Sequence, residues 1–310
     1  MMAATRLDGD PSAFFHAPVM LGEMLAALAQ APGMVFVDAT LGGAGHSSAL
    51  LRSRPEVRLF GFDRDPRAIA AATARLAEFG ARATVTHAAF DEIEAALDAA
   101  GIEQIDGLMA DLGVSSEQLT DPARGMSFRA AGPLDMRMDP TRGETALDLI
   151  ARVSQDELAD LIFELGEERA SRRIARCIKQ AHAAERLTDT LELRRAVVRA
   201  VGPRRVGGVD PATRTFQALR MAVNGENAQL KALLGFARKR VVPGGVTAIL
   251  SFHSIEDRAV KRELYVRAEW EPLSKKPLVP SEAEVETNPR SRSAKLRAAR
   301  RVETAGESSE

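Results

Sequence analysis

Short apolar runs alternate with longer helical stretches over the first third of the chain. Strands are predicted where apolar and β-branched residues cluster, at residues 35–37, 58–62, 83–86 and 105–110. Helices are predicted between them, at residues 46–52, 66–79 and 90–100. Strands that alternate with helices are typical of a mostly parallel sheet with helices on both faces. The pattern therefore predicts an α/β fold.

The pattern changes after Asp111. Residues 113–143 are rich in glycine and proline and have no clear periodicity. A loop of this length inside a compact domain is usually functional or disordered. Within it, residues 125–140 contain three methionines, which indicates either a lid that orders when substrate binds or an irregular loop whose methionines fill gaps in the core. Residues 146–201 have apolar positions three or four apart, which predicts a helical insert.

The alternating pattern returns in the last third. We predict a helix at 216–242, a turn at 243–245, a buried strand at 246–251, and a capping box of Ser254 and Asp257 that opens another helix. The expected division of the chain is a sheet domain of residues 1–112 and 211–302, a loop and helical insert of residues 113–210, and a flexible tail of residues 303–310.

A glycine-rich turn follows the first predicted strand. Gly42, Gly43 and Gly45 let the backbone turn sharply before a helix whose free N–H groups face a ligand. About twenty residues later, Asp63 lies at the carboxyl end of the second strand, where a carboxylate can accept two hydrogen bonds from a ribose diol. A purely structural turn is the alternative. Together the two features favour a nucleoside site.

The glycine spacing argues against a dinucleotide. A G-x-G-x-x-G fingerprint that starts at Gly43 would need glycine at position 48, where the chain has Ser48. Asp38 precedes the loop, and an acid there suits a ligand with a positive amino-acid tail and no pyrophosphate. S-adenosylmethionine fits this description and NAD does not.

Two further residues extend the predicted site. Asp111 follows the fourth strand, where the adenine and the methyl group would lie, although a strand-end aspartate can also simply cap a turn. Phe90 begins the helix after the third strand and either packs on an adenine face or belongs to the core.

The composition limits the function classes. Hydrophobic residues make up 45% and charged residues 27% of the chain, as is ordinary for a globular protein. One cysteine, Cys177, excludes an internal disulfide or a multi-cysteine metal site. The five histidines suggest no metal cluster, and Asp135 with Asp139 is too little for one. No signal peptide or membrane span is apparent, so we expect a cytoplasmic protein.

Basic residues gather in two runs, although the formal net charge is only −1. The first run is Arg194, Arg195, Arg199, Arg204, Arg205, Arg214 and Arg220, with Asp210 among them. The second is Arg290, Arg292, Lys295, Arg297, Arg300 and Arg301, with no acid between them. Such runs are usually solvated faces. Beside a nucleoside site, they favour contact with phosphates. Phe128 and Phe252 are the loop aromatics that could stack on a base.

Eight blocks of sequence, in order along the chain, resemble the bacterial 16S ribosomal RNA cytosine-N4 methyltransferases. They are residues 16–20 (HAPVM), 37–47 (VDATLGGAGHS), 111–119 (DLGVSSEQL), 132–140 (GPLDMRMDP), 166–169 (GEER), 211–220 (PATRTFQALR), 251–258 (SFHSIEDR) and 288–293 (NPRSRS). A match of this length and order is far more specific than a single glycine loop.

The resemblance implies a Rossmann-like class I methyltransferase sheet with a helical insert and S-adenosylmethionine as cofactor. The implied substrate is a cytidine of the decoding centre in 16S rRNA of the small ribosomal subunit, without a membrane partner, for a monomer or homodimer. The implied cofactor contacts are Ala44, Gly45, His46, Asp63, Phe90, Asp111 and Gln118. Many members of the family have glycine where Ala44 stands, and we expect a negative φ there, which alanine adopts without strain.

The predicted chemistry needs an acceptor for the amine proton. The exocyclic amine of cytosine is a poor nucleophile because its lone pair is delocalised into the ring, and an acceptor on N4–H assists methyl transfer. Asp111 and His253 are the candidate catalytic residues. We expect an acceptor near the loop after Asp111, with His253 holding the base. The alternative is that His253 belongs to a turn and helix cap between Ser251 and Asp257.

Three other function classes stay open on the sequence. A nicotinamide-dependent oxidoreductase is opposed by the missing third glycine. A non-enzymatic nucleic-acid binder with a nucleoside pocket is opposed only mildly, by the intact Asp63 and Asp111. A small-molecule methyltransferase fits the sheet, but the insert and the basic runs disfavour it. The DNA amino-methyltransferases usually have D-P-P-Y after the fourth strand, whereas this chain has D-L-G-V at 111–114.

Overall fold

The computed structural model describes residues 18–203 and 208–303. A seven-stranded sheet has the order β3-β2-β1-β4-β5-β7-β6. The strands are β1 (Val35–Asp38), β2 (Arg58–Asp63), β3 (Ala83–His87), β4 (Ile105–Asp111), β5 (Val241–Ser251), β6 (Trp270–Pro272) and β7 (Lys295–Arg301). Strands β1 to β5 pair in parallel, and β7 runs antiparallel between β5 and β6. The predicted class I methyltransferase fold is confirmed.

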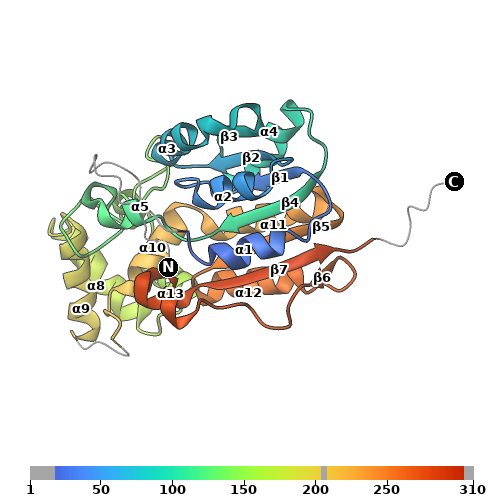
Figure 1. The fold of residues 1–310 in the computed structure, drawn as a ribbon. Coiled ribbons are helices and arrows are strands. Elements are labelled where there is room, and N and C mark those ends of the chain that lie inside the picture. Colours follow the sequence, from blue (N-terminus) through green and yellow to red (C-terminus); the bar gives the residue numbers. More distant parts are fainter. Residues whose placement is uncertain (1–17, 204–207, 304–310) are drawn as a thin grey trace.

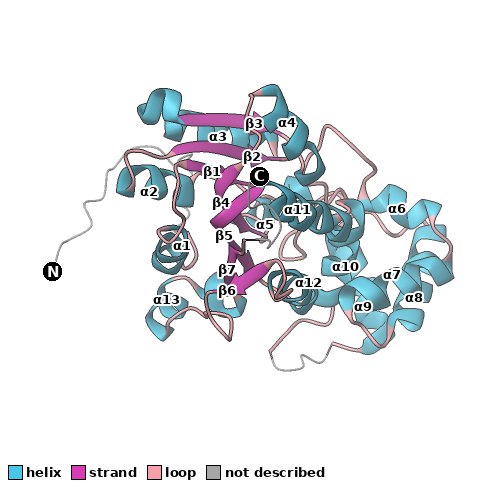
Figure 2. Ribbon diagram, turned by 90° about the vertical axis from the view of Figure 1, so that its right-hand side faces the viewer, coloured by secondary structure: helices cyan, strands magenta, loops and turns pink. Residues whose placement is uncertain are grey.

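Helices cover both faces of the sheet, as Figure 2 shows with the sheet seen near its edge. On one face lie α1 (Leu21–Leu28), α2 (Gly45–Ser53) and α3 (Pro66–Leu76), whose apolar residues share one core with the sheet. On the other lie α4 (Ile93–Ala99), α11 (Glu226–Arg240) and α12 (Ser254–Leu264). The fully buried aromatic side chains of Phe36 and Phe62 pack on opposite faces.

A third hydrophobic core lies beyond the carboxyl ends of the parallel strands, where Figure 1 shows α8 and α9. It is formed by α6 (Ala146–Arg152), α7 (Gln155–Gly166), α8 (Ser171–Ala183), α9 (Thr190–Val201) and α10 (Thr213–Val223). Capping boxes open α6 and α7, where Thr145 and Ser154 accept the N3 amides. Helix α10 follows the boundary expected at 210, and its Phe216 and Leu219 belong to this insert core.

The remaining elements are short. They are α5 (Ser116–Thr120), α13 (Glu282–Thr287) and the 3-10 turns η1 (Ala77–Arg82), η2 (Phe90–Glu92), η3 (Pro122–Arg124) and η4 (Pro289–Ser293). Helix α5 interrupts the stretch that we predicted to be a loop. Its signal is a capping box that the sequence analysis missed, in which Ser115 and Gln118 bond to each other's backbone amides.

Three local predictions in the last third were wrong. The helix expected at 216–242 is two helices, because Gly225 adopts φ 58° and breaks it between α10 and α11. The turn expected at 243–245 lies within β5, where the pairing with β4 is irregular and Gly244 has φ 82°. The residue that caps α12 is His253 with Glu256, one position before the predicted Ser254 and Asp257.

Strands β6 and β7 were also missed, because β7 reads as a basic segment. Arg297 is nevertheless buried in the sheet, where its guanidinium lies 2.7 Å from Asp257. In the part of the chain that the structure describes, no helix has both the length and the apolar character needed to cross a bilayer.

Gly107 on β4 is a tight point in this packing. A Cβ added there would lie 2.2 Å from the buried ring of Phe36, whereas one added at Gly235, on the exposed side of α11, would meet nothing within 4 Å. We expect Gly107→Ala to lower the unfolding free energy by about 1–3 kcal/mol through overpacking. The control, Gly235→Ala, should raise it by about 0.5–1 kcal/mol. Urea unfolding of both variants checks this, and equal midpoints would contradict it.

Candidate active site

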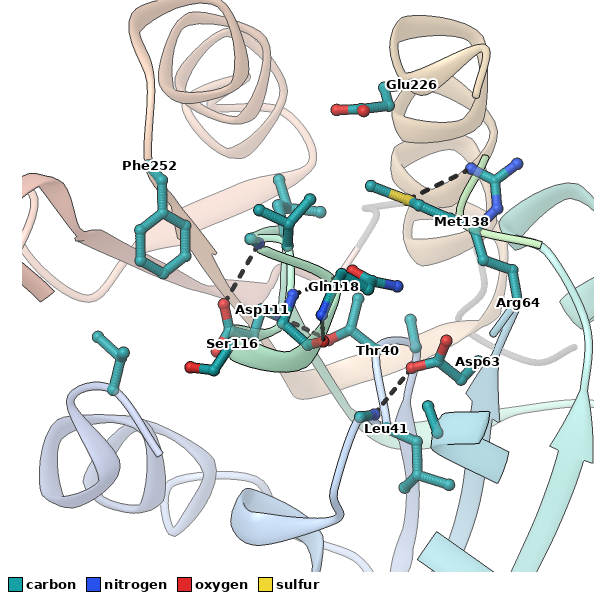
Figure 3. Close-up of a pocket in the computed structure, with 18 of the residues that line it drawn as sticks. Thr40, Leu41, Asp63, Arg64, Asp111, Ser116, Gln118, Met138, Glu226 and Phe252 are labelled. Carbon is teal, nitrogen blue, oxygen red and sulfur yellow. Dashed lines mark hydrogen bonds between the residues drawn. The ribbon is translucent and has the colours of Figure 1, made fainter. Parts of the chain in front are cut away.

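The loop between β1 and α2 carries the predicted glycines and contacts the end of β2. The amide of Gly42 donates to Oδ2 of Asp63 at 2.8 Å (Figure 3). Oδ1 of Asp63 accepts the amide of Asp65 at 2.8 Å. Each carboxylate oxygen of Asp63 therefore accepts one backbone N–H. Because a carboxylate has about four acceptor positions, capacity remains for two ribose hydroxyls.

The same loop is tied to β1 and β4 by side chains. Asp38 is buried, with Oδ2 accepting the Ser47 hydroxyl at 2.6 Å and Oδ1 accepting the amide of Thr40 at 3.1 Å. The hydroxyl of Thr40 in turn accepts the amide of Asp111 at 2.5 Å. The ends of three neighbouring strands are thus held around one space, where ligands of parallel sheets bind.

That space is a cavity of about 420 Å³, within the usual range for small-molecule sites. The predicted residues that line it are Gly45, His46, Asp63, Phe90, Asp111, Gln118 and His253. Figure 3 shows Asp111 between Asp63 and Phe252. The acidic and apolar groups near Asp63 and Phe90 suit an adenosine, so this part of the cavity fits the cofactor that the sequence suggested.

Ala44 differs from the expectation. It has φ 55° and ψ 33°, so the predicted negative φ was wrong. Its methyl group is fully buried in the core beneath the loop and does not line the cavity. The left-handed conformation costs alanine about 1–2 kcal/mol, and burial of the methyl group offsets part of this cost.

Burial changes the acidity of two of these carboxyl groups. It raises the pKa of Asp63 to about 6, against the lowering effect of the two backbone amides. Burial likewise raises the pKa of Asp38, and the hydrogen bond from Ser47 opposes the shift. An acid whose pKa is raised in a cavity is a common mark of a functional site.

Gln118 and Phe90 line the cavity and also make contacts within the protein. Both ends of the Gln118 amide are engaged: Nε2 donates to Asp65 at 2.8 Å and Oε1 accepts the amide of Ser115 at 3.0 Å. Phe90 packs against the core under α4 and α11 while lining the cavity, so the two alternatives considered for it are compatible.

The far part of the cavity contains a cluster that the sequence did not reveal. Ligand atoms of Glu226, His253 and Glu256 lie within 4.8 Å of one another. Arg220 binds the Glu226 carboxylate at 2.7 and 2.8 Å in a buried pair. Since Arg220 already neutralises Glu226, these distances alone do not make the cluster a metal site. Glu226 is the first residue of α11 and is distant from His253 in the sequence, so no local spacing pattern predicts that the two side chains meet.

His253 caps α12, as one alternative predicted, and still lines the cavity. Its Nδ1 accepts the amide of Glu256 at 3.4 Å, so the neutral ring carries its proton on Nε2. The Nε2 atom is buried and lies 3.0 Å from Oε1 of Glu256, but the two atoms do not have the geometry of a hydrogen bond.

The methionine loop contributes one residue to the cavity. Met126 and Met136 are buried and fill the core, whereas Met138 lines the cavity beside Arg64, whose Nη1 lies 4.0 Å from the sulfur (Figure 3). Loop and lid were alternatives for this segment, and the structure shows a packed loop with one residue at the site. Phe128 stacks edge-on against Phe216 at 4.9 Å between ring centroids, within the insert.

Acids bind several of the basic residues in the two runs, and contact of the runs with phosphates stays a prediction. In the first, acids bind Arg194, Arg195 and Arg220. In the second, acids bind Lys295, Arg297, Arg300 and Arg301. For the second run, the sequence does not reveal the pairing because acids such as Asp257 come from other segments of the chain. Residues 16–17, 204–205 and 304–310, which carried other predictions, lie outside the described residues.

The sheet order, the antiparallel β7 and the acid-lined cavity at the ends of β1, β2 and β4 define a class I methyltransferase that uses S-adenosylmethionine. The chain belongs to the MraW methylase family, whose model matches residues 13–302.

Relatives match over nearly the whole length. The chain is 63% identical to the ribosomal RNA small subunit methyltransferase H of Sorangium cellulosum, over 93% of this chain and 91% of that protein. It is 49% identical to the protein of the same name from Synechococcus elongatus, over 95% and 97%. A solved rRNA methylase of Streptococcus thermophilus aligns over 92% and 95% at 12% identity and a TM-score of 0.39, a likeness too weak for inference.

The raised pKa of Asp63 predicts pH-dependent cofactor binding. A carboxylate accepts two ribose hydroxyls in its ionised form, so we expect affinity for the cofactor above pH 6 and its loss as the pH falls below about 6. The dissociation constant for S-adenosylmethionine should rise by up to about tenfold per pH unit below that point, because binding must then release a proton. Calorimetric titrations between pH 5 and 8 measure it.

Asp63→Asn is the test of this assignment and Asp156→Asn, at a carboxyl group that is 83% exposed, the matched control. The first variant should bind weakly at every pH with no inflection near 6, and the control should follow the wild type. An unchanged inflection in Asp63→Asn would assign the titration to another group.

Proposed function

We propose that this protein transfers a methyl group from S-adenosylmethionine to N4 of cytidine 1402 in the decoding centre of 16S rRNA. The observation that carries the proposal is one continuous cavity, which joins the cofactor end at Asp63 to a second end at His253 and Phe252. The family resemblance and the printed names of the relatives support the small ribosomal subunit as the substrate. Such a substrate places the reaction in the cytoplasm.

The cofactor residues have distinct roles in this proposal. Asp63 holds the ribose, the loop at Gly43, Gly45 and His46 admits the amino-acid tail, and Phe90 flanks the adenine. Gln118 acts by holding α5 against Asp65. S-adenosylmethionine, when bound, supplies an already activated methyl group, so the protein has mainly to align the nucleophile and exclude water.

Asp111 is the group we assign to the amine. Its backbone amide is fixed by Thr40 at the end of β4, which holds the residue between the two ends of the cavity. A carboxylate there accepts a hydrogen bond from N4–H and helps to localise the lone pair on nitrogen. It then stabilises the positive charge that develops on nitrogen and accepts the proton that leaves.

His253 suits a different task. With Nδ1 engaged as an acceptor, its Nε2–H is the donor of the ring, and it lies 3.0 Å from Oε1 of Glu256 without the geometry of a hydrogen bond. A donor at this place can hold the O2 or N3 acceptor of cytosine and so aim the amine at the methyl group. The target nucleotide must leave its stack to reach a cavity of this kind, as other base-modifying enzymes require.

Transfer of a labelled methyl group to small ribosomal subunits, followed by nucleoside analysis, tests the proposal. The wild type should produce N4-methylcytidine. Asp111→Ala should lower kcat by about 100-fold or more through loss of the acceptor. Asp63→Ala should chiefly weaken cofactor binding. Asp156→Ala, in the exposed pair with Arg172, is the control and should leave both parameters unchanged.

Two results would overturn the proposal. One is cofactor binding without transfer to subunits or to free 16S rRNA, which would leave a small-molecule substrate. The other is a methylated product other than N4-methylcytidine, which would refute the assignment of the amine.

A further inference from the structure

Arg290 stands apart from the other arginines that line the cavity. Arg220 is bound by Glu226, Arg75 donates to the carbonyl oxygen of Gly43, and Arg64 donates to that of Asn224. Arg290 lines the same cavity, and its guanidinium has neither an acid nor a hydrogen-bond acceptor among the described residues. It is therefore a cation at the site that the protein itself does not neutralise.

The backbone around Arg290 is firmly held. It belongs to η4, where the buried Ser291 hydroxyl donates to the carbonyl oxygen of Asn288 at 2.8 Å. Two donors in this segment, Nη1 of Arg290 and Nδ2 of Asn288, are shielded from solvent and make no hydrogen bond. Leaving a buried donor unsatisfied costs roughly 1–3 kcal/mol, and more for a charged group. Such a group in a native structure calls for an explanation, often an absent ion or ligand.

A second arginine reinforces the positive charge. Arg129, on the loop that leads into the insert, is exposed, and its side chain has no acid partner in the described chain. Desolvation and the nearby charge of Arg129 together lower the pKa of Arg290. Arg129 does not line the cavity itself but a separate hollow with Phe128 and Arg194, so it contributes positive charge without belonging to the cavity wall.

We propose that Arg290 binds an RNA backbone phosphate next to the target cytidine, with Arg129 adding positive charge. This inference rests on the proposed function and adds the element that fixes the strand relative to the cavity. A guanidinium matches a phosphate because its planar donors can bind two oxygens at once. Arg194, Arg220, Arg297 and Arg301 of the two basic runs differ from Arg290, because each is bound by an acid.

The other anion that could reach Arg290 is the carboxylate of S-adenosylmethionine. The two sources differ in their consequences. A phosphate contact affects the affinity for RNA and its salt dependence but not the affinity for the cofactor. A carboxylate contact affects the affinity for the cofactor and leaves the salt dependence of RNA binding unchanged.

The experiment compares the wild type with Arg290→Gln, Arg129→Gln and the control Arg267→Gln, an exposed arginine after the far end of α12. Three quantities are measured: the KM for small subunits at several salt concentrations, kcat, and the dissociation constant for S-adenosylmethionine. For Arg290→Gln we expect KM to rise about tenfold to a hundredfold. The slope of log KM against log salt should fall by about 0.7. The values for kcat and the cofactor should stay unchanged.

Arg129→Gln should show the same change in slope with a smaller rise in KM, and Arg267→Gln should show neither change. An unchanged KM and salt slope in Arg290→Gln, or a weakened cofactor affinity with an unchanged slope, would overturn the phosphate site while the proposed function stands. A wild type that transfers no methyl group to subunits or RNA is a separate failure, that of the proposed function itself.

Discussion

The loop between β1 and α2 is bound by hydrogen bonds to the ends of three neighbouring strands. Its Thr40 amide binds Asp38 on β1, its Gly42 amide binds Asp63 on β2, and its Thr40 hydroxyl accepts the Asp111 amide on β4. Because these strands are parallel, their carboxyl ends meet at one edge, and a single loop can reach all of them. The spacing of the carboxyl groups of Asp63 and Asp111 across the cavity thus depends on one short segment of backbone.

This arrangement costs free energy that the rest of the fold must offset. Burial raises the pKa values of Asp38 and Asp63, so the charged form of each carboxyl group costs more free energy here than in water. Ala44 adds left-handed backbone strain at the start of α2. The apolar cores on both faces of the sheet hold the loop in place, and Ala44 itself packs into one of them. Strain and desolvated acids collected at one loop are typical of a functional site rather than of a purely structural turn.

The sequence predicted the parts of the site whose signals are local. A strand, a glycine turn and an acid about twenty residues later identify the ends of β1 and β2, and the position of Asp111 follows from the next crossover. Glu226 could not be found in this way, and Arg290 was noted only as a member of a basic run, because only the folded chain brings them to the cavity. The basic segment of β7 misled for the same reason, since the neutralising Asp257 lies about forty residues earlier.

The insert loop and the sheet domain are joined by buried polar contacts rather than by apolar packing alone. Arg124 forms a buried ion pair with Asp65 and also donates to the carbonyl oxygens of Arg137 and Met138. On the other side, the side-chain oxygen Oδ1 of Asn224 accepts a hydrogen bond from the backbone amide of Met138 at 2.7 Å.

A buried ion pair is seldom a strong source of stability, because desolvation opposes the attraction between its charges. Its geometry is nevertheless specific, since a shift of one residue in the loop would separate the Arg124 guanidinium from the Asp65 carboxylate. Asp65 also caps α3 and receives the Gln118 amide. Met138 and Asp63, which both line the cavity, are therefore held in register through the same short segment, so that a change in the position of the insert loop must also change the end of the cavity at Asp63.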